Sequence, residues 1–323
     1  MTVLRVGTWN LYEYDRHDHR DPAAAQRYTQ VAKVLTDLDV DVIAVQEVCG
    51  RGRAALEQLA KDAGMFCWYD PPFVDEDEYF RGRVAFAGTE PRPSDFHVGL
   101  LWNPARIRAR VDGFRPFEGG GEFWHAAAVQ EFRVDGLDRP LVVGSYHGTP
   151  FQQDARPDEA RRIVSILTRP YGENRLAIIG GDWNSISADR VHRDGEWQFW
   201  HPDPYWIEGA ENVWREPFTY QCIVTETGPD GMPVRWHADR RPGEVLMRAG
   251  CRDTAALAGA AWAPSVGHAD HADMGYRTLD THRVSPALTP AVADWQVVDW
   301  QVAREASDHL PVVTTLDLSR LES

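Results

Sequence analysis

Cysteine and long apolar segments are both scarce in this sequence. The four cysteines, Cys49, Cys67, Cys222 and Cys251, are far apart in a chain of 323 residues and form no CxxC pair. This spacing argues against a disulfide framework or a cysteine-ligated zinc site, so we expect reduced cysteines that mainly pack. No apolar run reaches the roughly 18 residues of a membrane-spanning helix, and the N-terminus lacks the features of a signal peptide. We therefore expect a cytoplasmic protein that does not insert into membranes.

Positive charge is scarce as well. Lys and Arg total 34 against 49 Asp and Glu, which gives a formal net charge of −15. This balance argues against adhesion to duplex nucleic acid or anionic lipid by charge alone. It does not exclude phosphate substrates, because a bound divalent cation reverses the local field.

What the sequence does contain is typical of a globular α/β protein. Residues 3–9 alternate in apolar character like a strand, and apolar residues recur with helical spacing over 23–38. The other predicted strands are 41–47, 97–102, 127–134, 141–146, 176–180 and 311–316, and the other predicted helices are 54–63 and 158–167. Strands interleaved with helices indicate packed sheets with helices outside them.

The aromatic residues are concentrated in one stretch. No linker or internal repeat divides the chain, so we expect a single domain over residues 1–323 with an irregular, aromatic-rich insert at about 185–276. The insert includes Trp197, Trp200 and Trp214 among the 13 tryptophans of the chain. Such residues can stack on bases or on an apolar leaving group, or form the core of an irregular subdomain. We interpret most of them as core and one or two as a pocket rim.

Polar clusters follow several predicted strands. They are centred on Asn10, Glu47, His147 and Asp182, and a further cluster at 307–309 precedes the last predicted strand. A single carboxylate or amide after a strand is usually a turn former or a helix cap. Several together, at the strand ends where α/β folds place ligands, indicate a functional site.

In their order along the chain, these clusters carry a resemblance. Thr8-Trp9-Asn10, Gln46-Glu47, a strand ending in His147, Gly181-Asp182-Trp183-Asn184 and Ser307-Asp308-His309 resemble the endonuclease/exonuclease/phosphatase superfamily, which has the pancreatic-deoxyribonuclease-like fold. The RTLDTHRVS segment at 277–285 is similar to the family's Arg-Ile-Asp-Tyr-Ile-x-Val-Ser, and 246–254 is similar to a helix ahead of it. The resemblance runs from about residue 3 to residue 316. It implies a four-layer α/β sandwich in which two packed mixed or antiparallel sheets are flanked by helices.

The resemblance also implies a metal-dependent hydrolase of phosphate esters. Glu47 is the expected Mg²⁺ ligand, with Asn10 and Asp308 close to the same ion, and Mn²⁺ is expected to substitute. Hard oxygen donors suit Mg²⁺, which keeps several waters and takes few carboxylates. Phosphoester hydrolysis needs such charge neutralisation together with a water placed in line.

The remaining site residues take roles around the phosphate. Asp182 is the candidate to orient or deprotonate the attacking water. We expect Asn184, His147 and His309 to bind the phosphate, and Asp280 to pair with His309, which would fix its tautomer and favour its protonated form. Four further residues are candidates for substrate contact: Trp183, Tyr146, His271 and Arg277.

The substrate is less determined than the chemistry. We expect a phosphodiester and, first among substrates, DNA or RNA; a small phosphorylated metabolite or a lipid head group is the alternative. A catalytically silent binding module on the same fold is a third reading, and a zinc site built on His268, Asp270 and His271 is a fourth. No protein partner is evident in the sequence.

Overall fold

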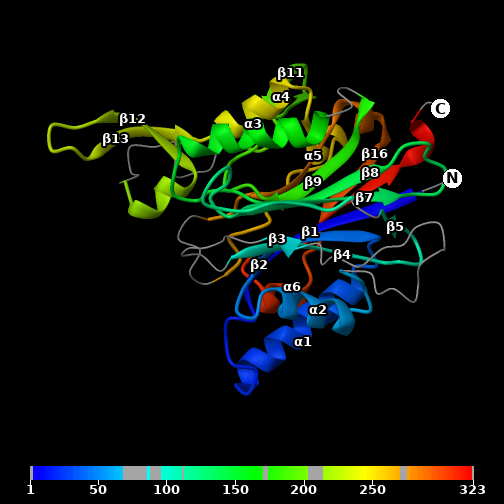
Figure 1. The fold of residues 1–323 in the computed structure, drawn as a ribbon. Helices are drawn as coiled ribbons and strands as arrows, with labels where there is room; N and C mark the ends of the chain where they lie inside the picture. The colour runs from blue at the N-terminus through cyan, green and yellow to red at the C-terminus, as the bar shows by residue number, and fades with distance from the viewer. Residues whose placement is uncertain are drawn as a thin grey trace.

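Two β-sheets pack face to face and carry helices on their outer sides (Figure 1). This computed structural model describes residues 3–67, 86–87, 96–110, 113–169, 174–202, 214–269 and 275–321. The layers are therefore helix, sheet, sheet and helix, as the resemblance implied.

The first sheet has six strands in the described ranges. In spatial order they are β16 (Val292–Val297), β17 (Val312–Asp317), β1 (Val3–Tyr14), β2 (Val42–Val48), β4 (His97–Trp102) and β3 (Phe86–Ala87). β1 and β2 are parallel, and the other neighbours are antiparallel. The sheet thus joins the first and last strands of the chain.

The second sheet is built in the same way around one parallel pair. In spatial order its strands are β14 (Arg252–Asp253), β15 (Asp280–Val284), β9 (Leu176–Asp182), β8 (Leu141–His147), β7 (Ala126–Arg133) and β5 (Arg108–Ala109), with β6 (Arg115–Phe117) also paired to β7. β8 and β9 are parallel. The carboxyl ends of β8 and β9 therefore lie at the same edge, and so do those of β1 and β2.

Helices link and cover the sheets. The α-helices are α1 (Pro22–Asp37), α2 (Arg53–Asp62), α3 (Ala155–Thr168), α4 (Arg241–Arg248), α5 (Thr254–Leu257) and α6 (Gln301–Ala306), and the 3-10 helices are η3 (Glu216–Tyr220), η4 (Pro286–Ala291) and η5 (Leu318–Arg320). α1 connects the parallel strands β1 and β2, and α3 connects β8 and β9. A helical crossover of this kind is what parallel neighbours require.

The start of α1 shows how sequence sets an element. Asp21 precedes the helix and its side chain accepts a hydrogen bond from the Ala23 N–H, while Pro22 occupies the first turn. Both features favour a helix start. Val31 and Leu35 then bury one face against the first sheet.

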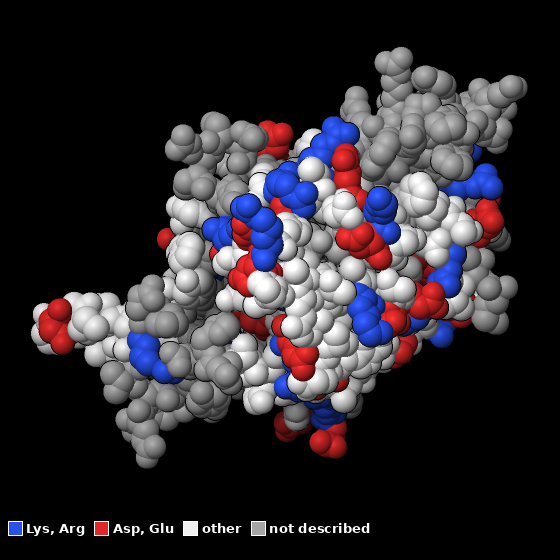
Figure 2. Space-filling view, turned by 90° about the horizontal axis from the view of Figure 1, so that it is seen from below, with Lys and Arg blue, Asp and Glu red and all other residues white. Residues whose placement is uncertain are grey.

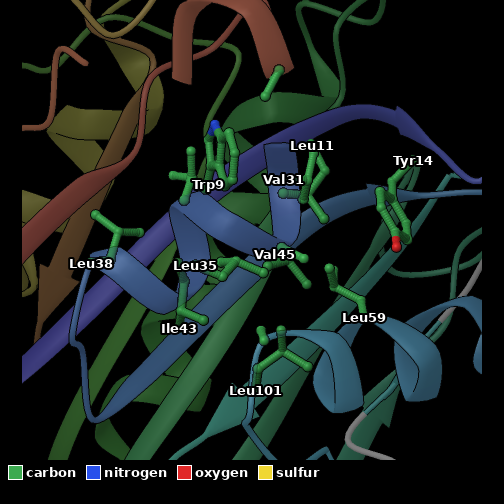
Figure 3. Close-up of a cluster of buried hydrophobic side chains, with 14 of the residues drawn as sticks. Trp9, Leu11, Tyr14, Val31, Leu35, Leu38, Ile43, Val45, Leu59 and Leu101 are labelled. Atoms are coloured by element: carbon green, nitrogen blue, oxygen red, sulfur yellow. The ribbon is translucent and has the colours of Figure 1, made fainter. Parts of the chain in front are cut away.

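Because side chains alternate along the strands, the hydrophobic core is divided into an inner part between the two sheets and two outer parts, each between a sheet and its helices. In β1, Leu4 and Val6 face the second sheet, whereas Trp9 and Leu11 face the helices. Figure 3 shows Trp9 and Leu11 packed with residues of α1 and α2 such as Leu35 and Leu59. Burying one such aliphatic side chain contributes about 1.5–3 kcal/mol. The alternation has period two, so it also decides which polar residues enter the space between the sheets.

Two predicted boundaries are corrected. β1 continues to Tyr14 instead of ending at residue 9, so Asn10 lies within the strand. The predicted irregular insert at 185–276 contains regular structure: α4, α5, β14 and two hairpins, β10 (Arg190–Arg193) with β11 (Glu196–Phe199) and β12 (Cys222–Thr227) with β13 (Pro233–Ala238). Trp200 of this stretch is fully buried, as predicted for most of its aromatic residues, whereas Trp197 is exposed. The single domain over 1–323 stays a prediction.

The outer surface over α1 and α2 carries charges of both signs side by side. Figure 2 shows Lys and Arg interspersed with Asp and Glu on this face, and Lys33–Asp37 and Arg53–Glu57 are among its ion pairs. Among the described residues, no helix is both long and apolar enough to cross a membrane.

Candidate active site

Strand register brings the predicted site residues to one edge of the sandwich. In the second sheet, His147 lies opposite Asp182 in the parallel pair β8 and β9, and Asp280 of β15 lies opposite Asp182 on its other side. Alternation from Leu141 and Ile178, which face the inner core, points His147 and Asp182 toward the first sheet. These residues therefore meet in the space between the sheets.

Asn10 connects the two sheets at this edge. Alternation from Leu4 places the Asn10 side chain on the inner face of β1, where it is fully buried. Its Nδ2 donates to Glu47 Oε1 at 3.0 Å and to Asp182 Oδ2 at 3.1 Å. One amide thus holds a carboxylate from each sheet.

Glu47 reaches the site because its backbone breaks the alternation of β2. The backbone φ of Glu47 is 57°, in the left-handed region that residues other than glycine rarely adopt. Regular alternation would send Glu47 toward the helices; instead its carboxylate accepts from Asn10 and from the Glu13 N–H at 2.9 Å. Burial, and then the neighbouring Asp308 carboxylate, raise the pKa of Glu47 to about 7.

His309 and Asp280 form a buried pair. His309 Nδ1 lies 2.7 Å from Asp280 Oδ2, the pairing expected from the sequence. Burial alone would lower the pKa of His309, but Asp280 and then Asp308 outweigh it and raise that pKa well above its usual value. This direction favours the protonated form of His309.

Two histidines face the Asp182 carboxylate. His309 Nε2 lies 3.8 Å and His147 Nε2 lies 3.7 Å from Asp182 Oδ2. Burial, and then the charge on His309, lower the pKa of His147 to about 3. The two imidazoles beside this carboxylate therefore have pKa shifts in opposite directions, which favour a neutral His147 and a protonated His309.

The turn after Asp182 is tied to the turn after His147. Asn184 has a φ of 46°, its backbone N–H donates to Asp182 Oδ1 at 2.9 Å, and its Nδ2 donates to the Gly148 carbonyl at 3.0 Å. A Cβ on Gly148 would lie 2.7 Å from the Trp183 carbonyl oxygen, so only glycine allows this close approach. The amide of Asn184 is consequently held at the mouth of the site.

Tyr146 and Trp183 are corrected as substrate-contact candidates. Alternation turns Tyr146 to the outer face of β8, where its hydroxyl donates to Glu159 at 2.5 Å. Trp183 packs against Tyr146 with ring centroids 4.8 Å apart and donates from Nε1 to the Thr281 carbonyl at 3.0 Å. Both side chains are buried under α3 and α4, away from Asp182.

Of the other two candidates for substrate contact, Arg277 is described and His271 is not. Arg277 is buried and donates to the Gln221 side chain and the Gly275 carbonyl. His271 and Asp270 lie outside the described residues, so the contact of His271 with substrate and the zinc alternative stay predictions. His268 itself is described, and its Nε2 lies 2.9 Å from the Ser307 carbonyl oxygen, next to Asp308 in sequence.

The structure adds residues that sequence reasoning missed. His125, just before β7, stacks on His147 with centroids 4.0 Å apart and an interplanar angle of 8°. Ser265 accepts the Asp280 backbone N–H at 3.1 Å, and Ser307 donates to the Asn10 carbonyl at 2.8 Å. Ser307 belonged to a motif, but His125 and Ser265 lie outside every motif. Only the fold brings these two to the site.

Glu47, Asp308 and Asn10 form a donor set that suits a hard divalent cation. Glu47 and Asp308 are close enough for the Asp308 charge to raise the pKa of Glu47, a repulsion that a cation between them would relieve. Asn10 Oδ1 accepts from the Tyr12 N–H at 3.0 Å and has a second lone pair. Within the described ranges, no three His, Cys, Asp or Glu side chains are grouped as metal ligands. Few protein ligands and several waters are the usual coordination of Mg²⁺.

Comparisons with known proteins identify the family and the fold. The sequence matches the model of the Endonuclease/Exonuclease/phosphatase family over residues 7–309. No match was found among curated proteins.

Solved structures with the same fold span essentially the whole chain. An endonuclease/exonuclease/phosphatase from Bacteroides vulgatus is 14% identical, with 100% of each chain covered and a TM-score of 0.62. A mannosyl-6-phosphatase from Bacteroides thetaiotaomicron is 15% identical, with 96% of this chain and 98% of that chain covered and a TM-score of 0.59. D. rerio TDP2 in complex with a single-strand DNA product is 14% identical, with coverage of 98% and 99% and a TM-score of 0.55. Because the family model spans nearly the whole sequence and the sandwich agrees with it, the chain belongs to the Endonuclease/Exonuclease/phosphatase family.

Proposed function

We propose that this protein is a divalent-metal-dependent phosphodiesterase in which Asp182 positions the attacking water. Members of the family are hydrolases that act on phosphate esters. The observation that carries the proposal is the convergence on Asp182 Oδ2, which lies 3.1 Å from Asn10 Nδ2 and 3.7 and 3.8 Å from the Nε2 atoms of His147 and His309. A carboxylate among three such groups is placed to orient a water and to take its proton during in-line attack.

The groups around Asp182 would bind the phosphate. His309, held protonated by Asp280, donates from Nε2 to a non-bridging oxygen, where negative charge grows in the transition state. His147 is neutral and donates from the opposite side. The Asn184 amide, with one N–H on the Gly148 carbonyl, has a second for the phosphate. These donors are fixed before substrate arrives, so little reorganisation is needed.

Glu47 and Asp308, with Asn10, would hold the metal. A divalent cation held by these residues would neutralise charge on a non-bridging oxygen and would stabilise the leaving oxygen. Asn10 also fixes the position of the Glu47 carboxylate relative to the Asp182 carboxylate, because the same Nδ2 donates to both. Mg²⁺ is the metal we propose, with Mn²⁺ as a substitute.

DNA or RNA is the first substrate class that we propose. The fold shared with TDP2, which was solved with a single-strand DNA product, supports this choice. A small phosphorylated metabolite is the second candidate. It is favoured by the net charge of −15, which offers a long polyanion little attraction. The shared fold of the mannosyl-6-phosphatase supports the same candidate.

A substrate panel tests the proposal. Single- and double-stranded DNA, RNA, bis-p-nitrophenyl phosphate and p-nitrophenyl phosphate would be incubated with Mg²⁺, Mn²⁺ or EDTA. We expect metal-dependent cleavage of at least one diester and a loss of about 10²–10⁴-fold in Asp182→Asn. Asp294→Asn, at an exposed position in β16, is the matched control and should keep full activity. A folded wild-type protein that cleaves nothing, or an Asp182→Asn variant at full rate, would contradict the proposal.

A further inference from the structure

A cavity of about 660 Å³ lies beside the candidate active site. Its described walls come from the loop before β7, from the residue before β4 and from the segment that leads into α3. None of the assigned catalytic or metal-binding residues lines it. The cavity is therefore a separate feature next to the reaction centre.

Aromatic rings connect the inner wall of the cavity to the catalytic groups. His125 lines the cavity and stacks face to face on His147 at 4.0 Å between centroids. Phe96 also lines it and meets both imidazoles edge-on, 5.5 Å from His125 and 6.3 Å from His147. His147 Nε2 is 3.7 Å from Asp182 Oδ2, and the His125 ring stacks on the His147 ring. A group in the cavity is therefore separated from the proposed phosphate site by the stacked rings of His125 and His147.

The outer wall presents exposed aromatic rings. Trp124 is 39% and Phe151 is 53% exposed, and their rings meet at an angle of 70° with centroids 6.5 Å apart. Glu159 accepts the backbone N–H groups of Trp124 at 2.6 Å and Thr149 at 3.1 Å. Both rings are thus exposed to solvent, and the Trp124 backbone is anchored, which suits stacking on a flat ligand.

Charge in the cavity selects against a second phosphate. Its described lining includes the carboxylates of Glu122, Asp158 and Glu159 and no Lys or Arg. Each carboxylate is already paired, Glu122 with Arg162 at 3.1 Å, Asp158 with Arg161, and Glu159 with backbone N–H groups and Tyr146. A neutral aromatic ring fits such a lining, whereas a phosphate would find no Lys or Arg among the described lining residues.

We propose that this cavity binds the nucleobase that is joined through its sugar to the scissile phosphate. The inference rests on the proposed phosphodiesterase function and names the substrate class of that same site, a nucleoside phosphodiester. The phosphate lies among Asp182, His147 and His309, and the base stacks on Trp124 with Phe151 nearly perpendicular to it.

Two esters with one leaving group test the base contact. Thymidine 5′-(p-nitrophenyl phosphate) and methyl p-nitrophenyl phosphate differ in the thymidine group, whose base would enter the cavity. With Mg²⁺, wild type should show a kcat/KM at least about tenfold higher for the nucleoside ester, within the 5–150-fold that stacking supplies. Trp124→Ala and Phe151→Ala should each lower this preference about tenfold by raising the KM of the nucleoside ester. Neither variant should change kcat/KM for the methyl ester. Trp197→Ala, at a 66% exposed Trp on β11, is the control and should change neither ester.

The outcomes separate the two proposals. Cleavage of both esters with no preference, or an equal loss on both in the variants, would overturn the base assignment and leave the phosphodiesterase intact. Cleavage of neither ester by folded wild type, with no other diester cleaved, would remove the proposed function. Calorimetry gives a readout without turnover: wild type should bind thymidine 5′-monophosphate about tenfold more tightly than 2-deoxyribose 5-phosphate, and Trp124→Ala should abolish that difference. Equal affinities in wild type would overturn the cavity assignment.

Discussion

Two residues of the site, Glu47 and Asn184, have left-handed backbone conformations, with φ of 57° and 46°. For most side chains this conformation costs about 1–2 kcal/mol. At Glu47 it turns the carboxylate toward Asn10, and at Asn184 it aims the amide at Gly148. Backbone strain at these two positions therefore serves to direct polar groups into the site.

Substitution of Asn184 separates strain from side-chain chemistry. Asn184→Gly removes the amide but tolerates the left-handed conformation, so its stability should stay within about 1 kcal/mol of wild type. Asn184→Ala should be less stable than the Gly variant by about 1–2 kcal/mol. Both should lose kcat by a similar factor, about 10², because both lack the donor. Urea unfolding and turnover measure the two effects; equal stability of the Gly and Ala variants would show that the backbone strain is unimportant.

His309 should be indispensable for turnover. His309→Ala removes the cationic donor and should lower kcat by at least about 10²–10³-fold while the fold is kept. Asp280→Asn keeps a hydrogen-bond acceptor for Nδ1 but removes the charge that holds His309 protonated, so its loss should be smaller. Single-turnover kinetics with circular dichroism check both variants. His271→Ala is the comparison and should leave the chemical step largely unchanged; a near-wild-type rate in His309→Ala would refute the assignment.

At the scale of elements, buried polar side chains join the two sheets below the site. Gln46 of β2 donates to Ser145 Oγ of β8 at 2.9 Å, and Ser145 donates to the Val45 carbonyl at 2.9 Å. A second network ties the segment after β9 to β14 and β15, where the Asp189 carboxylate accepts from Arg283 and Arg252. Arg283 and Asp189 are both buried. The strands that carry the site are thus locked together by groups that are costly to leave unpaired.

Removal of Asp189 should destabilise the protein strongly. Asp189→Ala leaves the buried Arg283 without its main counter-ion, with only Asp253 at 3.3 Å, and should cost about 3–5 kcal/mol. The control is Asp299→Ala, which breaks a largely exposed pair with Arg304 and should cost at most about 1 kcal/mol. Denaturant midpoints compare the two. An Asp189→Ala variant as stable as the control would mean that the network does not join the strands.

Strand alternation explains both a success and a failure of sequence reasoning. Alternation places His147, which was expected to bind the phosphate, on the inner face of β8 with Leu141 and Val143, although Val142 is apolar too and the sequence pattern alone does not choose the face. The same rule places Tyr146, a candidate for substrate contact, on the outer face with Val142. Glu47 is the opposite case, because alternation alone would have excluded it and only its left-handed φ returns it to the site.

At the scale of the whole molecule, the space between the sheets holds titratable groups out of water. His282 is fully buried there, with Nδ1 3.0 Å from Thr314 Oγ1, and burial lowers its pKa to about 4. In the unfolded chain its pKa is about 6.5. The unfolded state therefore takes up this proton first as the pH falls, and stability is lost from about pH 6.5 downward.

Acidification should accordingly weaken the fold through His282. The shift from about 6.5 to about 4 corresponds to about 3 kcal/mol, present in full above pH 6.5 and lost as the pH falls toward 4. His282→Gln keeps a polar group for Thr314 but does not titrate, so between pH 7.5 and 4.5 it should lose about 2–3 kcal/mol less than wild type. Urea unfolding across this range gives the difference, which isolates His282 from the other groups. Parallel stability curves for the two proteins would contradict the prediction.

By itself, the sequence determined most of the strands and helices up to β9 and the last strand, the helix-outside architecture and the residue types available for phosphoester chemistry. It could do so because periodicity and motifs act over a few neighbouring residues. Only the tertiary structure decided which of these residues meet. The register of β8, β9 and β15 aligns His147, Asp182 and Asp280, and sheet packing brings Asn10 across to Asp182. His125 and the aromatic cavity are also decided at this level, because they arise from chain segments that are distant in sequence and meet only when the layers pack.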